Sequence, residues 1–192
     1  NKAENNLKEV LNEVCGENNY RINEGDGAFY GPKIDIKMKD CLGREWQMGT
    51  VQVDFQLPLR FNLSYIDKDG EKKSPILIHR ALFGSLERFI GIITEHYAGA
   101  FPTWLAPIQV KIIPVNLNYH TDYCKKLQQL FLENSIRQEV DFRDEKLGYK
   151  KREAQTKKIP YSLVIGDNEV QNNLVTYRRH GSQAQVTVTV EE

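Results

Sequence analysis

Apolar residues recur with two different periods near the start of the chain, and each period predicts a different element. Residues 7–14 place leucine and valine at the i, i+3, i+4 and i+7 spacing of a helix with one buried stripe, which stops at Gly16. Lys33–Lys39 then alternates polar and apolar residues, which predicts an antiparallel strand after a glycine-rich loop. The expected role of the helix over residues 7–14 is structural packing.

The stretch EWQMGTVQVDFQL, residues 45–57, also alternates but changes phase near Gly49. A phase change of this kind is typical of a β-bulge or of a close backbone approach. Beyond the change, Gln52, Asp54 and Gln56 share one face. That polar row suits hydrogen bonding to a ligand, and it equally suits a face exposed to solvent.

The stretch Pro75–Tyr97 is the one around which the chain is arranged. An apolar run ends in a Gly84–Ser85 turn, and an amphipathic helix follows with Glu87 and Arg88 in its first turn. A basic residue there opposes the helix dipole, because a helix N-terminus already carries partial positive charge. A bound phosphate would compensate the positive charge of Arg88, so this turn is expected to form one wall of a nucleotide pocket. The alternative is a surface ion pair between Glu87 and Arg88.

A change of composition at residues 99–107, where two prolines flank Trp104, predicts a domain boundary. We place the domains at 1–103 and 104–192. The first is an α+β arrangement with an antiparallel sheet. In the second, strands alternate with helices, which predicts parallel pairing and an α/β mixed sheet closed by an edge hairpin. Its expected strands are Ile108–Val115, Ile136–Phe142, Tyr161–Ile165, Val170–Arg179 and Gln185–Val190, and its expected helices are Thr121–Asn134 and Glu145–Thr156.

Charge and cysteine content narrow the class of protein. The 192 residues include 26 basic and 26 acidic side chains, a net charge of +0, which argues against a protein that coats nucleic acid or membrane surfaces. Three widely spaced cysteines form no disulfide framework, so a reducing, cytoplasmic setting is expected. No apolar run approaches the roughly 20 residues that span a bilayer. Position 1 is Asn and the first segment begins within a helical pattern, which predicts a part of a longer protein.

Two further features carry candidate chemistry. His79 lies on the apolar strand ILIHRAL, where it is either a core histidine or a metal ligand. A basic patch in the second domain either binds RNA or forms a solvated helix face. It comprises Lys146, Lys150, Lys151, Arg152, Lys157, Lys158, Arg178 and Arg179.

Four segments occur in an order that is typical of one family: GAFYGPKIDI, WQMGTVQVDF, LIHRALFGSLERFIGIITE and FPTWLAPIQV. They resemble the bacterial-type threonyl-tRNA synthetases, and the resemblance runs from Leu7 to the C-terminus. GSLERF is similar to motif 3 of the class II synthetases, and the part after Pro107 is similar to the anticodon-binding domain shared with the prolyl, histidyl and glycyl enzymes. The resemblance implies the C-terminal portion of a catalytic domain followed by an anticodon-binding domain. The family joins threonine to ATP and transfers the threonyl group to the end of threonine tRNA.

The resemblance implies an ATP site. Arg88 would contact the γ-phosphate and stack near the adenine of a bent ATP, which is used with Mg²⁺, and Ser85 would lie by the same pocket. Gln47 and Thr50 match positions that line the adenylate. The residues that match positions around the amino acid and the tRNA end are Tyr30, Lys33 and Gln52.

The resemblance also implies a zinc site for selecting threonine. His79 matches the third protein ligand of the family's catalytic zinc, and the other two ligands, a Cys and a His, would precede Asn1. Three protein ligands leave an open position, which threonine fills with its amino and hydroxyl groups. Valine lacks the hydroxyl, so the metal rejects an isostere that an apolar pocket separates only weakly. Serine would need an editing site, and the sequence shows none.

In the second domain the resemblance implies anticodon contacts from Glu169, Arg178 and the turn that carries Asp144 and Lys146. Carboxylate and guanidinium groups pair with the edges of unstacked loop bases. Two positions depart from the family pattern: Asp144 stands where Asn is frequent, and Lys158 where Arg is frequent. Asp144 lacks the donor amide of Asn, and Lys158 lacks the planar guanidinium of Arg. Base-specific roles at these two positions are therefore in question.

The family further implies threonine, ATP and threonine tRNA as partners, a homodimer in the full-length enzyme, and no membrane. Nothing in the sequence resembles motifs 1 or 2, so we do not expect this chain alone to form the adenylate. A stand-alone RNA-binding module, or a synthetase-like accessory protein without catalysis, is therefore the alternative. A related synthetase of the same class is a third option, disfavoured because His79 and Gln52 occur together as in the threonyl enzyme.

Overall fold

The computed structural model describes residues 2–191 and divides into two compact units, Asn1–Glu95 and His96–Glu192. The expected domain limits, 1–103 and 104–192, stay a prediction, and each unit is described by itself. Within the described residues, none of the helices has the length and apolar character needed to cross a membrane.

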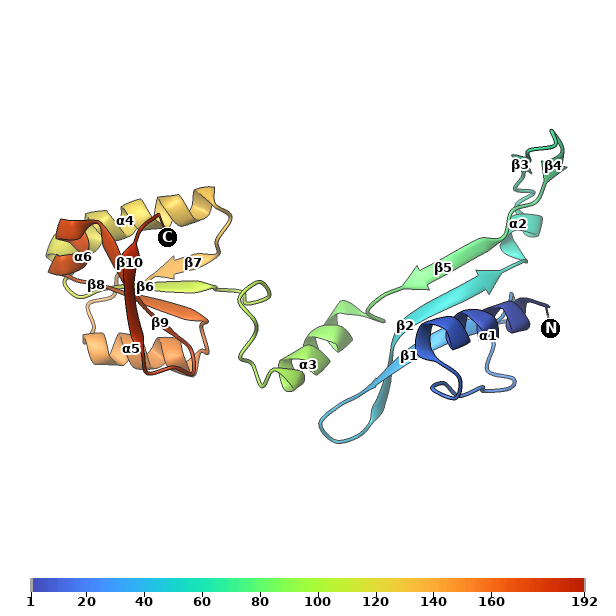
Figure 1. Cartoon of the computed structure of the whole chain (residues 1–192), viewed down its shortest axis with the longest axis horizontal. Coiled ribbons are helices and arrows are strands. Elements are labelled where there is room, and N and C mark those ends of the chain that lie inside the picture. Colours follow the sequence, from blue (N-terminus) through green and yellow to red (C-terminus); the bar gives the residue numbers. More distant parts are fainter. Residues whose placement is uncertain (1, 192) are drawn as a thin grey trace. The chain divides into compact units, whose positions relative to one another are not determined.

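Unit 1 is built on a three-stranded antiparallel sheet in the order β1-β2-β5. The strands span Lys33–Lys39, Glu45–Asp54 and Leu77–Ala81, and β3 (Tyr65–Ile66) and β4 (Lys72–Lys73) form a separate small hairpin. The helices are α1 (Lys2–Cys15), α2 (Leu57–Arg60) and α3 (Leu86–His96). Figure 1 shows α3 following β5. The α+β class expected from the sequence is confirmed.

A bulge interrupts the pairing of β1 with β2. Ile36 pairs with Gly49 and Lys37 pairs with Gln47, so Met48 is the extra residue, and it is buried. The change of phase expected near Gly49 is therefore a β-bulge. It re-aims the backbone of β2 just before the polar residues of that strand.

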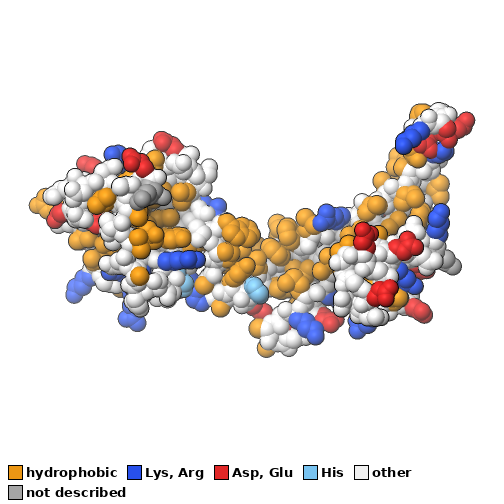
Figure 2. Space-filling view, in the orientation of Figure 1, with side chains coloured by type: hydrophobic (Ala, Val, Ile, Leu, Met, Phe, Trp, Pro, Cys, Tyr) orange, Lys and Arg blue, Asp and Glu red, His pale blue; other side chains and the backbone are white. Residues whose placement is uncertain are grey.

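Apolar side chains lie exposed on unit 1 around β5 and α3, as Figure 2 shows. β5 is the outer strand of its sheet, so one of its edges has no neighbouring strand among the described residues. The exposed apolar residues of this region are Ile76, Ile78, Leu82, Phe83, Leu86 and Ile90.

Unit 2 contains a five-stranded mixed sheet in the order β10-β9-β8-β6-β7. β6 pairs in parallel with β7 and β8, whereas β9 pairs antiparallel with β8 and β10, which confirms the α/β mixed sheet expected from the alternation of strands and helices. The strands are Val110–Pro114, Gln138–Val140, Tyr161–Ile165, Leu174–Arg179 and Gln185–Thr189, and the helices are α4 (Leu117–Glu133), α5 (Leu147–Thr156) and α6 (Asp167–Asn172).

The expected strand Val170–Arg179 is wrong at its start, because Val170–Asn172 belongs to α6. The Glu169 carboxylate accepts from the backbone N–H of Gly166 at 2.8 Å, which is half of a capping box. Asn173 then ends the helix in the left-handed conformation, with φ of 54°. These local signals outweigh the strand propensity of Val170.

The two faces of this sheet carry different helices, as Figure 1 shows. Val110 and Ile112 of β6 pack with Leu127 of α4 in one core cluster. Ile113, the next residue, packs on the other face with Ala154 of α5. Successive side chains of a strand point to opposite faces. The face that carries α5 is therefore also the face of Lys111.

Candidate functional site

A polar face of the unit 1 sheet brings together most of the site residues expected there. Lys33, Gln52 and His79 are paired directly across three adjacent strands. Asp35 and Thr50 form the next row. Because side chains opposite each other in a sheet share a face, these residues line one surface.

Lys33 and Gln47 are held by a single carboxylate, that of Asp35. The Lys33 ammonium donates to one oxygen at 2.7 Å, and the Gln47 amide donates to the other at 2.8 Å. The hydrogen bond to Asp35 raises the pKa of Lys33, so the ammonium stays charged at neutral pH. Both side chains are thereby fixed on the polar face.

Tyr30 and Thr50 border the middle of the same face. The Tyr30 hydroxyl donates to the Gln52 side-chain oxygen at 2.7 Å, and the Tyr30 ring lies 6.0 Å from the His79 ring. The Thr50 hydroxyl is buried and has no hydrogen-bond partner among the described residues. A buried hydroxyl without a partner is uncommon in a folded protein, so Thr50 has hydrogen-bonding capacity left for a ligand.

His79 is held by a carboxylate that the sequence did not link to it. The Asp54 side chain is fully buried, and its Oδ2 lies 2.8 Å from His79 Nε2. Burial alone raises the pKa of Asp54, but hydrogen bonds from the Leu57 N–H, His79 and the Gln56 N–H outweigh it and lower the pKa below its ordinary value. Asp54 is therefore buried and bonded to His79. It neither faces a ligand nor is exposed to solvent, which were the two expectations for its row.

The N-terminus of α3 is capped by Ser85. The Ser85 hydroxyl accepts from the Arg88 N–H at 3.1 Å, and the Ser85 carbonyl accepts from the Phe89 N–H. The Glu87 backbone N–H and the Ser85 hydroxyl lower the pKa of the Glu87 carboxylate, so it stays charged beside the positive end of the helix.

Arg88 points away from Glu87 and toward β2. Its Nη1 donates to the Gln47 carbonyl at 2.6 Å, and its guanidinium lies over the Trp46 ring, 5.7 Å from the centroid. No ion pair joins Arg88 to Glu87 within the described residues, so the surface-pair alternative is not what this structure has. The guanidinium therefore lies against the Gln47 backbone and the Trp46 ring, at the bulge of β2.

Gly84 makes this approach possible. Its φ is +67°, and a Cβ there would lie 2.8 Å from the Gln47 carbonyl oxygen and 3.1 Å from that of Met48. The turn before α3 thus packs against the bulge of β2 so closely that only glycine fits. The bulge and Gly84 together place Arg88 beside Gln47.

Two residues of this site, Asp35 and Trp46, are not among those expected from the sequence, and Asp54 is expected only as part of a polar row, without its link to His79. The alternation of β1 and β2 indicates that Asp35 and Asp54 face inward or outward with their neighbours, but only the strand register shows what each contacts. Among the described residues, no group of three or more His, Cys, Asp or Glu side chains could hold a metal ion. His79 is therefore not part of a complete ligand set within the described residues.

In unit 2, Glu169 is fixed by two hydrogen bonds. One oxygen accepts from the Gly166 N–H at 2.8 Å and the other from the Thr176 hydroxyl at 2.6 Å. Burial raises the pKa of Glu169, but these hydrogen bonds lower it below its ordinary value. The carboxylate is thus charged and oriented, with lone pairs left on both oxygens.

Arg178 holds the turn between β9 and β10. Its Nε donates to the Ser182 carbonyl at 2.6 Å, and its Nη2 donates to the Gln183 side chain at 2.9 Å. Thr176 and Arg178 are two residues apart on β9 and share a face. Glu169, which contacts Thr176, therefore borders the same surface as Arg178.

The remaining predicted RNA contacts lie around α5. Asp144 and Lys146 are exposed on the turn between β7 and α5. Lys158 lies beyond the other end of the helix, where its ammonium donates to the Ala98 carbonyl. The structure shows no direct contact between these three residues and Glu169 or Arg178 among the described side chains. It places all five in unit 2.

The basic patch is not one continuous solvated face. Lys150 is buried at 2% exposure and donates to the Asp141 carbonyl at 3.1 Å. Lys157 pairs with Glu153 at 3.0 Å. Lys146 and Arg152 are exposed. The patch therefore divides into residues that hold the fold and residues that face solvent.

Comparison with known proteins finds two family models, one for each of the two units of the chain. The tRNA synthetase class II core domain (G, H, P, S and T) matches residues 1–97, and the anticodon binding domain matches residues 109–192. A threonine–tRNA ligase of Clostridium novyi (strain NT) is 60% identical over 92% of this chain and 27% of its own length. One from Clostridium botulinum (strain Okra / Type B1) is 55% identical over 99% of this chain and 29% of its own length.

A solved structure of similar fold is titled as the RNA binding domain of threonyl-tRNA synthetase from Cryptosporidium parvum Iowa II. It superposes with a TM-score of 0.88 at 39% identity, over 99% of this chain and 48% of that one. The present chain spans less than a third of the length of the two curated relatives. The family expected from the sequence motifs is confirmed. The chain belongs to the class II tRNA synthetases of the G, H, P, S and T group, and the relatives that it resembles among them are threonine–tRNA ligases.

Proposed function

We propose that this chain supplies part of the ATP and threonine site, together with the anticodon-reading domain, of a threonyl-tRNA synthetase. Such an enzyme forms threonyl-adenylate from threonine and ATP and transfers the threonyl group to threonine tRNA. In this proposal the enzyme works as a homodimer in the cytoplasm. The observation that carries the proposal is the joint between Gly84 and the bulge of β2, which holds Arg88 against the Gln47 carbonyl.

Arg88 would bind the γ-phosphate of ATP, with Mg²⁺ entering as part of the nucleotide substrate. A guanidinium pairs with phosphate oxygens through charge-assisted hydrogen bonds, and the N-terminus of α3 adds a favourable dipole. Contact with the Gln47 carbonyl and the Trp46 ring fixes the guanidinium before ATP arrives. A group that is already oriented needs no reorganisation when charge develops on the leaving pyrophosphate.

Gln47 and Thr50 would orient the adenylate, and Tyr30, Lys33 and Gln52 would surround the amino acid and the tRNA end. The hydroxyl of Thr50 has no partner among the described residues and is free to bond a ligand atom. The Lys33 charge is kept by Asp35 and would offset negative charge on the substrate. Tyr30 and Gln52 hold each other and so present fixed polar atoms.

His79 would bind zinc through Nδ1. A carboxylate is an acceptor only, so the ionised Asp54 takes its hydrogen bond from the Nε2–H of His79, which leaves the lone pair of Nδ1 for a metal. Zinc would supply an open Lewis-acid position for the amino and hydroxyl groups of threonine. The described residues hold no complete set of three ligands, and in this proposal a Cys and a His from outside them would join His79.

Glu169, Arg178, Asp144, Lys146 and Lys158 would contact the anticodon loop. Glu169 and Arg178 border one surface of unit 2 with their side chains already oriented. Side chains fixed in this way can discriminate between unstacked bases, because a wrong base leaves their polar atoms unpaired.

Binding of an anticodon stem-loop tests the proposal on the chain as it stands. The stem-loop of threonine tRNA is expected to bind more tightly than the same RNA with a changed anticodon. Glu169→Gln keeps an acceptor for the Gly166 N–H but removes the charge, so it should reduce this difference without unfolding α6. Equal binding of the two RNAs by the unchanged chain would refute the proposal.

The second candidate is an RNA-binding module without catalysis. The observation that favours it is that the described residues hold no group of three or more metal-ligating side chains, while unit 2 forms a compact fold with its own core. ATP–pyrophosphate exchange that depends on threonine, measured with this chain alone, separates the two. We expect no exchange from the chain alone; exchange that a Cys- and His-bearing partner segment restores would favour the synthetase.

A further inference from the structure

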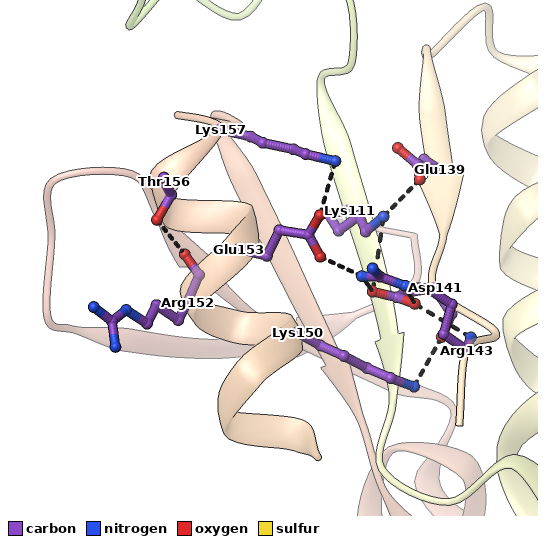
Figure 3. A network of polar contacts seen from close by, with 9 residues as sticks. All are labelled: Lys111, Glu139, Asp141, Arg143, Lys150, Arg152, Glu153, Thr156 and Lys157. Atoms are coloured by element: carbon purple, nitrogen blue, oxygen red, sulfur yellow. Dashed lines mark hydrogen bonds and ion pairs between the residues drawn. The ribbon is translucent and has the colours of Figure 1, made fainter. Parts of the chain in front are cut away.

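The turn between β7 and α5 is held by a network of charges that lies partly inside unit 2. Figure 3 shows Asp141 and Arg143 at the start of the turn, with Glu153 reaching toward them from α5. Asp141 and Lys111 are buried, at 2% and 4% exposure. Burying charged groups costs desolvation energy, so each of them needs hydrogen-bond partners in a fixed geometry.

Arg143 is the centre of this network. Its Nε and Nη2 donate to the two oxygens of Asp141 at 2.8 Å and 2.6 Å, which is a bidentate pair. Nη2 also donates to Glu153 in the second half of α5. The guanidinium lies 5.9 Å from the ring centroid of Tyr149, on the first turns of the same helix. One side chain therefore joins the end of β7 to α5.

Further contacts fix Asp141, the residue at the start of the turn. The Lys150 ammonium donates to the Asp141 carbonyl at 3.1 Å, and the Asp141 N–H donates to the Ile112 carbonyl at 2.9 Å. Lys111 donates to Glu139 at 2.7 Å and lies 3.9 Å from Asp141. These contacts fix the position of Asp141, and through it that of Arg143.

Among residues 2–191, no comparable side-chain contact holds the tip of the turn. Residues 144–146 are exposed, and Lys146 stands at the cap position of α5 without a side-chain hydrogen bond to the helix. The polar groups of Asp144 and Lys146 therefore face solvent from a backbone that is fixed on both sides. This is the arrangement that a binding loop on a rigid support requires.

We infer that Arg143 is a positioning residue for RNA recognition, because its bidentate pair with Asp141 and its bond to Glu153 fix the turn that presents Asp144 and Lys146. The inference rests on the proposed function of unit 2. Arg143 need not touch RNA. A lysine at this position keeps the charge but not the planar fork, so it cannot hold both oxygens of Asp141 and reach Glu153 at once.

Loosening the turn should affect base discrimination and leave the phosphate contacts unchanged. Attraction to phosphates depends on the number of cations and sets the dependence of binding on salt concentration. Arg143→Lys keeps that number. Discrimination depends on where the polar atoms of the tip lie relative to the base edges, and it should fall as the tip moves.

Arg137→Lys is the matched control. Arg137 is also in unit 2 and also uses its fork to hold backbone, donating from Nε to the Ala106 carbonyl and from Nη2 to the Trp104 carbonyl, but it does not contact the turn. Glu153→Gln is a second test variant, since it weakens the bond between Arg143 and α5 and leaves the bidentate pair with Asp141 in place. It also weakens the pair of Glu153 with Lys157 at the end of the same helix.

The experiment measures binding of the threonine anticodon stem-loop and of an anticodon-changed stem-loop across a salt series. Arg143→Lys should lower the ratio of the two affinities about five- to tenfold, which corresponds to roughly 1–1.4 kcal/mol of discrimination, with the salt slope unchanged. Glu153→Gln should lower it less, and Arg137→Lys should not lower it. Unfolding of each variant by urea identifies a general loss of fold.

Two outcomes overturn the inference, and they are distinguishable. If the unchanged chain discriminates and folded Arg143→Lys discriminates equally well, Arg143 does not position the turn and the proposed function stands. If the unchanged chain binds both RNAs equally, the proposed function fails and the inference fails with it. Equal loss of discrimination in Arg143→Lys and Arg137→Lys also overturns it, because the effect is then not specific to the turn.

Discussion

Asp54 on β2 holds His79 on β5 through a 2.8 Å contact between Oδ2 and Nε2, across the middle of the unit 1 sheet. The carboxylate is fully buried, whereas the imidazole is 42% exposed. Since the hydrogen bonds to Asp54 keep it ionised, it can only accept, and the imidazole proton must be on Nε2. In the neutral imidazole the other nitrogen, Nδ1, keeps its lone pair.

Asp54→Asn should reverse the tautomer of His79. The amide oxygen can still accept from the Gln56 and Leu57 N–H groups, which turns the amide nitrogen, a donor, toward Nε2. The ring proton would then move to Nδ1, the position that a metal needs unprotonated. Nitrogen chemical shifts of the imidazole in NMR spectra measure the tautomer directly.

Asp67→Asn is the control, because Asp67 accepts from Lys73 on an exposed turn and does not contact a histidine. It should leave all four imidazoles unchanged. In an enzyme that carries this chain and binds zinc, Asp54→Asn should also weaken zinc affinity by about 10- to 100-fold, the range for losing a carboxylate behind a metal ligand. A wild-type His79 with its proton on Nδ1 would contradict this account.

Gly84→Ala should destabilise unit 1 more than Gly70→Ala does. Both glycines have left-handed φ values, +67° and +79°, but only at Gly84 would a Cβ meet backbone, at 2.8 Å from the Gln47 oxygen. Both variants should lose about 1 kcal/mol from the φ constraint, and Gly84→Ala should lose roughly 1–3 kcal/mol more from the overlap. Urea unfolding compares them, and equal losses would show that the turn does not pack against the bulge.

Arg88→Ala should weaken ATP binding about tenfold or more, because a hydrogen bond to a charged group contributes about 1.5–3 kcal/mol. AMP binding should change little, since AMP lacks the γ-phosphate. Trp46 fluorescence in a Trp104→Phe background reports nucleotide binding, because the Arg88 guanidinium lies over the Trp46 ring.

Arg44→Ala is the matched control for Arg88. Arg44 also lies over the Trp46 ring, 5.6 Å from the centroid, but its Nε is paired with Asp40. Its removal should leave the preference for ATP over AMP intact. An equal loss of ATP affinity in the two variants would mean that Arg88 contributes only general positive charge.

The periodicity of the sequence predicted most strands and helices because each has a regular period and a local stop signal. Lys33–Lys39 and Tyr161–Ile165 agree with the structure residue for residue. The expected strand Val170–Arg179 is wrong at its start, because the cap formed by Gly166 and Glu169 begins a helix there. The spacing of these two residues is visible in the sequence. Local signals of this kind could have identified α6.

Contacts between distant residues could not be predicted in the same way. Asp54 appeared as a polar residue on a face with Gln52, and its burial under His79 depends on how β2 pairs with β5. Lys150 appeared as part of a basic patch, yet it is buried because α5 turns that side toward the end of β7. In both cases a charged residue is buried, which composition and periodicity alone do not indicate.

Asp141 should make the stability of unit 2 sensitive to acid. Its hydrogen bonds with Arg143, which outweigh burial, lower its pKa to about 2, whereas the unfolded-state value is about 3.9. A carboxyl group with a lowered folded-state pKa binds protons more readily in the unfolded chain. Its contribution is therefore fully present above about pH 4 and is lost as the pH falls toward about 2.

Asp141→Asn should remove this part of the pH dependence. Urea unfolding at neutral pH and at several values between pH 4 and pH 2 should show a decline that is smaller in Asp141→Asn by roughly 1–2 kcal/mol, allowing for screening at the half-exposed Arg143. The lowered pKa values of Glu153 and Glu169 leave a residual decline in both proteins. Asp122→Asn, on an exposed position of α4, should keep the wild-type decline. If Asp141→Asn declines as steeply as the unchanged chain, the pair with Arg143 does not stabilise the folded state.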